Sequence, residues 1–136
     1  MAKFVATNYN IEIGGTDFST SIAAVTLDVS AEEQETTAFS GTGWRTRVAG
    51  LKDASVSLDF HQDFGAAAVD ATLWPLLGGT VSVQIIPAGS VVSATNPSYS
   101  FTALVTEYQP FASSVGDLAT LSVSWPVVGE VTRATA

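Results

Sequence analysis

Apolar residues recur at every second position along much of this chain, and this alternation narrows the folds that it can adopt. The stretch ASVSLDFH (54–61) is the clearest case, because Ala, Val, Leu and Phe alternate there with Ser, Ser, Asp and His. The same pattern occurs at 9–13, 23–29, 81–85, 99–105 and 119–125. Successive side chains of a strand point to opposite faces of a sheet, so the alternation predicts strands that bury one face. We therefore expect residues 1–136 to form a single, mainly β domain, either a β-sandwich or a barrel-like sheet.

One segment interrupts the alternation with helical spacing. The sequence DFGAAAVDATLWPLLGG (63–79) places apolar residues three or four positions apart, and Pro75 and the Gly-Gly pair at its end are helix stop signals. It predicts one short α-helix at about 64–75 that flanks the sheet. The residues expected to pack on the core are Val69, Leu73 and Trp74.

The segment 30–47 fits neither a buried strand nor a plain surface loop. Its sequence AEEQETTAFSGTGW holds three glutamates, followed by a Phe and a Trp on either side of two glycines. Three of the chain's five basic residues follow closely, and two interpretations stay open. Either the segment is a hairpin whose strands pair charge against charge, or it is a long early loop that meets the opposite charges of another copy. The candidate contact residues are Glu32, Glu33, Glu35, Phe39, Trp44, Arg45, Arg47 and Lys52.

Charge and composition exclude several classes of function. The net charge is −8 with only five basic residues, so binding to the outside of DNA through its phosphates is not expected. Charged residues make up 13% of the chain, against the usual ~25%, which suggests that much of the surface faces other protein. No Lys or Arg occurs between Lys52 and Arg133, so the polar strand faces suit a packed interface or a smooth channel wall. No segment approaches the ~20 apolar residues of a membrane span.

The sequence offers little for catalysis or metal binding. His61 is the sole histidine, and although it lies near Asp63 and a serine-rich strand, no Gly-x-Ser-x-Gly motif accompanies it. We therefore expect no enzyme, with a small hydrolase using His61 as an alternative. One histidine and a glutamate cluster without alternating Asp or Asn make neither a zinc nor a calcium site, so no cofactor or metal is expected. The aromatic residues leave a second alternative, a carbohydrate-binding β-sandwich that holds glycans on exposed rings.

The order of these features resembles the major tail tube proteins of long-tailed, siphovirus-type bacteriophages. The resemblance rests on three stretches in sequence: EEQETTAFSGTGWRTRVAGLKDASVSLDF, DATLWPLLGGTVSVQIIP and YSFTALVTEYQPFASSVGDLATLSVSWPVVGEVTR. In that family an acidic, Thr-rich loop leads into a strand, a single short helix follows, and a further strand and a closing strand pair complete the domain. The resemblance covers most of the chain.

The resemblance implies a non-enzymatic structural protein whose fold is shared with the tube protein of type VI secretion. Its copies would form rings, commonly hexamers, that stack into a tail tube. The tube would surround a tape-measure protein, meet tail terminator and tail-tip proteins, and later pass DNA without sequence-specific binding. The loop at 30–47 would reach the neighbouring ring, and residues 1–7 would form a second contact arm. The protein would belong to the virion tail after assembly in the cytoplasm of a bacterial host.

Overall fold

The computed structural model describes residues 3–136 and contains one antiparallel sheet in the order β2-β1-β5-β6-β7-β4-β3. The strands are β1 (Asn10–Ile13), β2 (Thr16–Asp17), β3 (Ile22–Glu35), β4 (Arg47–His61), β5 (Thr80–Ile86), β6 (Ser98–Leu104) and β7 (Thr120–Ala134). The helical turns are η1 (Ser19–Ser21), α1 (Val69–Leu73) and η2 (Trp74–Leu76). The prediction of a mainly β, sandwich-like or barrel-like fold with one short helix is confirmed.

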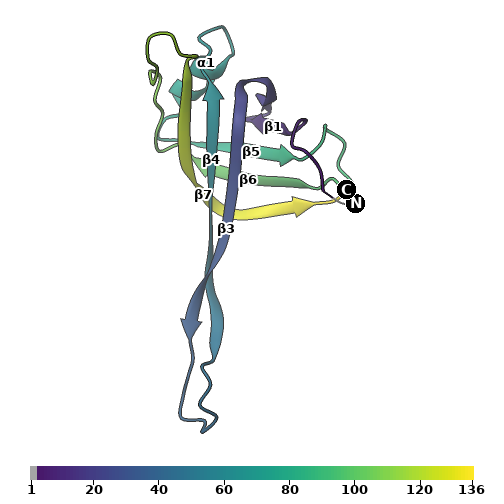
Figure 1. Ribbon diagram of the computed structural model, residues 1–136, viewed down its shortest axis with the longest axis vertical. Coiled ribbons are helices and arrows are strands. Elements are labelled where there is room, and N and C mark those ends of the chain that lie inside the picture. Colours follow the sequence, from purple (N-terminus) through teal and green to yellow (C-terminus); the bar gives the residue numbers. More distant parts are fainter. Residues whose placement is uncertain (1–2) are drawn as a thin grey trace.

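Strand β7 joins two layers of the folded sheet. Its first half, 120–126, pairs with β4, whereas its second half, 127–134, pairs with β6. Gly129 lies within the second half with a φ of +83°, a conformation that glycine adopts without steric cost. The strands β3 and β4 consequently run across β5 and β6, as in a sandwich with crossed layers (Figure 1).

The alternating apolar residues form the core between these layers. Val56, Leu58 and Phe60 of β4 are fully buried, as the period of two predicts. The core also holds Ile11, Ile13, Val81, Val83, Phe101, Ala103, Leu121, Val123 and Trp125. On β3, by contrast, Val25 and Leu27 are only partly buried and Val29 is exposed. This strand lies at the edge of the sheet, where one side has no strand to cover it.

The helix is shorter than predicted, and one of its three packing residues is misplaced. It begins at Val69 rather than near 64, because Ala67 has a φ of +56° and interrupts a helical backbone there. Val69 and Leu73 are buried, so their predicted packing is confirmed. Trp74 is 61% exposed, so its predicted burial is wrong. It follows Leu73 by one residue, which places its side chain about 100° around the helix axis from the buried face.

Replacing Leu73 with Ala should lower the free energy of unfolding by about 2–5 kcal/mol, because it leaves a cavity in the core. Trp74→Ala is the matched control and should change it by less than about 1 kcal/mol, since that side chain is exposed. Urea denaturation followed by circular dichroism measures both values. Equal losses in the two variants would contradict this account of the packing.

The segment predicted as a long loop at 30–47 is largely a strand ladder. Strands β3 and β4 pair from Ile22 opposite Phe60 to Glu35 opposite Arg47, with register shifts near each end. Only residues 36–46 are left as a loop. Sequence periodicity missed these strand ends because neither face of this part of the hairpin is buried.

Of the predicted N-terminal arm at 1–7, residues 1 and 2 lie outside the described residues, and residues 3–7 form neither helix nor strand. Within residues 3–136, every helix is too short to cross a membrane.

Candidate assembly surface

The hairpin of β3 and β4 extends well beyond the body of the domain. Figure 1 shows its far end at one extreme of the longest axis, with α1 near the other extreme. From Ser30 and Asp53 outward, the two strands pair only with each other. A two-stranded ribbon without a covering layer buries little apolar surface and gains little stability of its own. Its length is therefore better explained by contact with another molecule than by the stability of this one.

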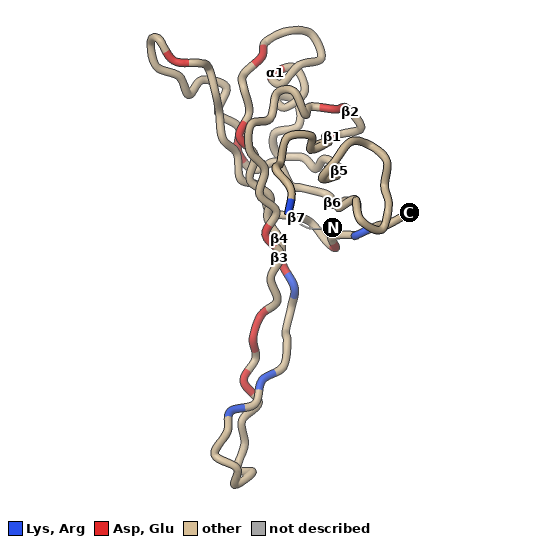
Figure 2. Tube along the Cα trace, turned by 45° about the vertical axis from the view of Figure 1, so that its right-hand side comes forward, with Lys and Arg blue, Asp and Glu red and all other residues tan. Residues whose placement is uncertain are grey.

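The charges of the hairpin pair across its own ladder. Arg47 forms an ion pair with Glu33, and Arg45 Nη1 lies 3.4 Å from Glu35 Oε1. Figure 2 shows these acidic and basic positions side by side along the ribbon. The structure thus supports the hairpin interpretation for two of the predicted charge pairs. Exposed ion pairs contribute about 0–1 kcal/mol each, so these charges stay available to a partner.

The remaining two charged candidates are not in ion pairs within residues 3–136. Glu32 accepts a long hydrogen bond of 3.5 Å from Gln34 Nε2 beside it. Lys52 lies opposite Ala31, where the hairpin leaves the body. There it lines a crevice of about 670 Å³ together with Glu130. The structure therefore divides the predicted cluster into paired residues near the end of the hairpin and single charges nearer its base.

The hairpin ends in a compact turn, residues 36–46, which we call the tip. Thr36 N donates to Thr46 O at 2.8 Å, and Thr46 N donates to Thr37 Oγ1 at 3.0 Å. These bonds hold the base of the tip, yet Phe39 is fully exposed and Trp44 is 79% exposed. Exposed aromatic side chains grouped on a projecting element are typical of protein contact sites.

A second exposed apolar surface lies at the opposite end of the molecule, around α1. The segments 62–78 and 105–119 form this surface, which we call the cap. Gln62 Nε2 donates to Pro110 O at 2.8 Å, and the rings of Phe64 and Phe111 lie 5.7 Å apart. The exposed apolar residues of the cap are Phe64, Trp74, Leu77, Phe111, Val115 and Leu118. The cap was not predicted as a contact surface from the sequence. Its apolar residues lie outside the alternating stretches, and this was a signal that could have indicated it.

Tyr108 holds the two cap segments together. Its hydroxyl donates to Asp70 Oδ1 at 2.7 Å and accepts from Gln62 Nε2 at 3.1 Å. Burial, together with the bond to the Asp70 carboxylate, raises the pKa of Tyr108 from 10.0 to about 12. The neutral phenol is therefore the form that the folded cap favours.

Tyr108→Phe should remove about 1 kcal/mol of stability at neutral pH through the lost hydrogen bonds. The pKa is higher in the folded chain, so the stabilising contribution of this phenol is complete below pH ~10 and disappears between pH ~10 and ~12. The difference in unfolding free energy between wild type and variant should shrink across that window. A constant difference from pH 8 to pH 12 would contradict the assignment.

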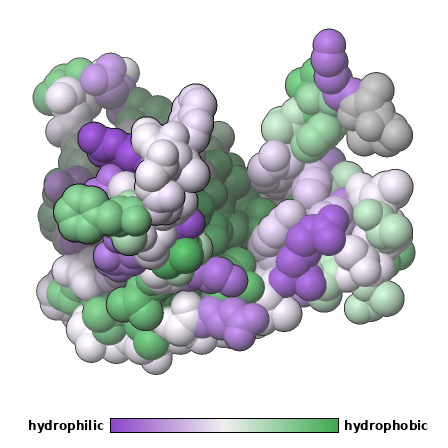
Figure 3. All heavy atoms as spheres, turned by 90° about the horizontal axis from the view of Figure 1, so that it is seen from below, coloured by the Kyte–Doolittle hydropathy of each residue, from purple (hydrophilic) through white to green (hydrophobic). Residues whose placement is uncertain are grey.

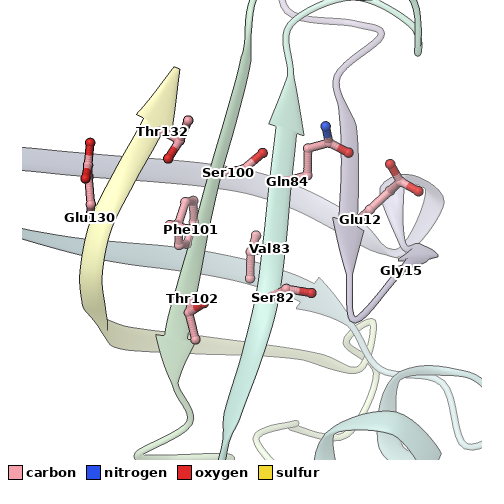
Figure 4. Close-up of a pocket in the computed structure, with 10 residues that line it drawn as sticks. All are labelled: Glu12, Gly15, Ser82, Val83, Gln84, Ser100, Phe101, Thr102, Glu130 and Thr132. Carbon is pink, nitrogen blue, oxygen red and sulfur yellow. The ribbon is translucent and has the colours of Figure 1, made fainter. Parts of the chain in front are cut away.

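The layer formed by β1, β5, β6 and the second half of β7 has a shallow polar hollow on its outer face (Figure 4). It has a volume of about 470 Å³ and carries hydroxyl, amide and carboxylate groups but no basic side chain. Its lining is Glu12, Gly15, Ser82, Val83, Gln84, Ser100, Phe101, Thr102, Glu130 and Thr132. Such a face repels phosphate and offers no nucleophile paired with a base.

An apolar groove opens between the two layers on the side from which the hairpin projects (Figure 3). It has a volume of about 460 Å³. Tyr9, Val25, Leu27, Val29, Ile85, Pro87 and Tyr99 line it. At its edge, Arg133 Nε donates to the Tyr99 hydroxyl at 3.2 Å, so the rim is cationic.

The hydrolase alternative gains no support from the surroundings of His61. Its Nδ1 is buried without a hydrogen-bond partner, and Asp63 Oδ1 instead accepts from the backbone N–H of Gly65. Across residues 3–136, no hydrogen bond links His61 to a serine or a carboxylate. The same part of the chain contains no group of three His, Cys, Asp or Glu side chains placed to hold a metal ion.

Comparisons with known proteins give a match in structure only. No protein-family model and no curated protein matches the sequence. A chain in the solved structure "Virion of native gene transfer agent (GTA) particle" is similar with a TM-score of 0.74 and 16% identity, over 93% of this chain and 95% of that one. A chain in "Tail of empty GTA particle computed with helical refinement, C6 symmetry" gives a TM-score of 0.66 and 21% identity, over 85% of this chain and 83% of that one. The fold is therefore shared across nearly the whole chain.

Proposed function

We propose that this chain is a structural subunit of a phage-like tail tube, in which its copies form rings and the rings stack. The projecting hairpin with its exposed aromatic tip carries the proposal, because the rest of residues 3–136 leaves Phe39 and Trp44 uncovered. The shared fold with chains of a gene transfer agent virion and tail supports it. The C6 symmetry named for that tail favours six copies in each ring.

Free sheet edges provide the contacts proposed within a ring. Strand β3 pairs on one side only, and at the other edge the two-residue strand β2 covers only part of β1. Unpaired N–H and C=O groups on such edges readily pair with another copy. Edge pairing would then join copies side by side, while the hairpin and residues 3–7 would join one ring to the next.

The polar strand faces suit the lumen of such a tube. An acidic surface without Lys or Arg repels the phosphates of passing DNA and so avoids trapping it. In this proposal the tube surrounds a tape-measure protein, ends at terminator and tail-tip proteins, and belongs to a virion that assembles in the host cytoplasm. The chain itself performs no catalysis and needs no cofactor.

Negative-stain electron microscopy of the purified chain tests this function. We expect rings or tubes of uniform width, accompanied by a large, concentration-dependent mass in light scattering. A chain that stays monomeric at every concentration, or that turns over a model ester in a His61-dependent manner, would overturn the proposal.

A further inference from the structure

We infer that the cap of one copy receives the hairpin tip of a second copy. This inference rests on the proposed assembly into a tube and identifies the surface that the hairpin binds. The tip contributes Phe39, Trp44 and Arg45, and the cap contributes the exposed rings of Phe64 and Phe111.

The placement of the exposed aromatic residues is the first argument. The Phe and Trp side chains that are at least half exposed within residues 3–136 are Phe4, Phe39, Trp44, Phe64, Trp74 and Phe111. All but Phe4 lie either on the tip or on the cap, at opposite ends of the longest axis (Figure 1). The exposed apolar surfaces of the tip and the cap lie at opposite ends, so they cannot meet within one copy. Joined between copies, they form a head-to-tail contact that repeats without closing, as a growing tube requires.

Charge is the second argument. Arg45 is the only ionisable residue of the tip, and its side chain is 72% exposed. The cap segments carry Asp63, Asp70, Glu107 and Asp117 and contain no Lys or Arg. Figure 2 shows acidic positions, without basic ones, at the end opposite to the tip. The tip therefore offers aromatic rings and the Arg45 guanidinium, whose exposed ion pair with Glu35 is weak, to an aromatic and anionic receptor. This favours tip against cap over tip against tip or cap against cap.

Three of the four cap carboxylates already accept hydrogen bonds, which narrows the choice of a partner for Arg45. Asp70 accepts from Tyr108, and Glu107 Oε1 accepts from the backbone N–H of Ser124 at 2.7 Å. Asp63 Oδ1 also accepts from the backbone N–H of Gly65 at 2.8 Å, so the exposed Asp117 is the cap carboxylate most open to a guanidinium. The contact between the Phe64 and Phe111 rings and the bonds through Gln62 hold the cap in shape before binding, so little conformational entropy is lost there.

The apolar groove between the two layers is a weaker receptor for the tip. None of its lining residues is acidic, and Arg133 donates a hydrogen bond to Tyr99 at its rim. Docking the tip there would bring Arg45 toward a like charge, which costs binding energy. The cap offers rings of the same kind with the opposite charge.

Cross-linking tests the contact cleanly, because the chain contains no cysteine. Thr42→Cys labels the tip, Ala66→Cys and Ser113→Cys label the cap, and Ser90→Cys labels the loop beside the groove; all four positions are exposed. Each full-length cap variant is mixed with the tip variant, assembled and treated with a short bismaleimide. We expect covalent dimers from tip plus cap at about tenfold the yield from tip plus Ser90→Cys, and little product from any variant alone.

The outcomes separate this inference from the proposed function. If wild type forms tubes but the Thr42→Cys tip cross-links to Ser90→Cys, to another tip or to no labelled site, the inference is overturned and the function stands. If wild type forms neither rings nor tubes and no pair cross-links, both fail.

A second pair of variants tests the same contact without depending on the cross-linking positions. Phe64→Ser combined with Phe111→Ser should reduce the amount of tube about tenfold, because exposed aromatic anchors dominate such contacts. Val91→Ser, which alters an exposed apolar side chain outside the tip, the cap and residues 3–7, should change it little. Equal tube yields from the cap variant and the Val91 variant would overturn the inference, provided that circular dichroism shows both to be folded.

Discussion

Tubes are expected to disappear when residues 36–46 are replaced by a two-residue Asn-Gly turn, while the body of the domain keeps its stability. Asn-Gly closes two antiparallel strands in a tight turn, so the shortened hairpin can still form. The replacement removes Phe39 and Trp44, both of which are exposed and contribute nothing to the core. Aromatic anchors of this kind cost about 2 kcal/mol or more each at an interface. Every subunit of a ring loses its anchors together, so stacking should fall below detection.

The matched control removes charge rather than aromatic surface. Glu33→Gln combined with Arg47→Gln abolishes one ion pair of the hairpin and should shorten tubes only slightly. Tube length by electron microscopy and unfolding of the separated subunit measure the two effects independently. Full-length tubes from the shortened hairpin would exclude the tip from stacking, and loss of the folded subunit would show that the tip stabilises the domain.

The alternation of apolar residues predicted the sandwich, because burial of one strand face selects an apolar residue at every second position. Where one strand face meets the core, as at Val56 and Leu58, the period of two follows from the pleat. The outer ends of β3 and β4 lack this signal, because both faces there meet solvent and nothing selects apolar residues at alternate positions. The same physical cause hid the hairpin from periodicity and left its charges as the visible feature.

The cap could not be predicted from local pattern, because contacts distant in sequence build it. Tyr108 and Asp70 are 38 positions apart, and nothing in either segment indicates that they meet. The misplaced Trp74 has a related cause. Spacing identified the buried face through Val69 and Leu73, but hydrophobicity alone suggested that the neighbouring Trp would be buried as well. The Trp74 ring is instead exposed on the cap.

The resemblance inferred from the order of sequence features agrees with the fold found by structural comparison. At 16% and 21% identity, few individual residues carry the likeness. The order of strands, helix and hairpin carries it instead, since many sequences can satisfy the same pattern of burial. Contact residues such as Phe39 or Arg45 are not constrained by that pattern and must be tested one by one.

Trp125→Ala should lower the unfolding free energy of the subunit by about 3–5 kcal/mol, the range for buried large aromatic residues. Trp125 is fully buried in β7, opposite Val56, just before the strand passes from one layer to the other. Its Nε1 donates to Glu107 O at 3.0 Å, which ties the cap segment to the core. The substitution therefore opens a cavity and leaves a carbonyl without its partner.

Trp125→Phe separates these two causes, since it keeps most of the ring volume and loses the hydrogen bond. It should cost less than the Ala variant, and urea unfolding measures the difference.

Domains of this size are stable by only ~5–15 kcal/mol, so the Ala variant should be partly unfolded as a subunit near body temperature. Assembly binds the folded state alone and should pull the variant back toward folding at high concentration. Tubes formed at high but not at low concentration by Trp125→Ala would support this linkage. An unfolding free energy within about 1 kcal/mol of wild type would instead show that the crossing of the layers does not depend on this ring.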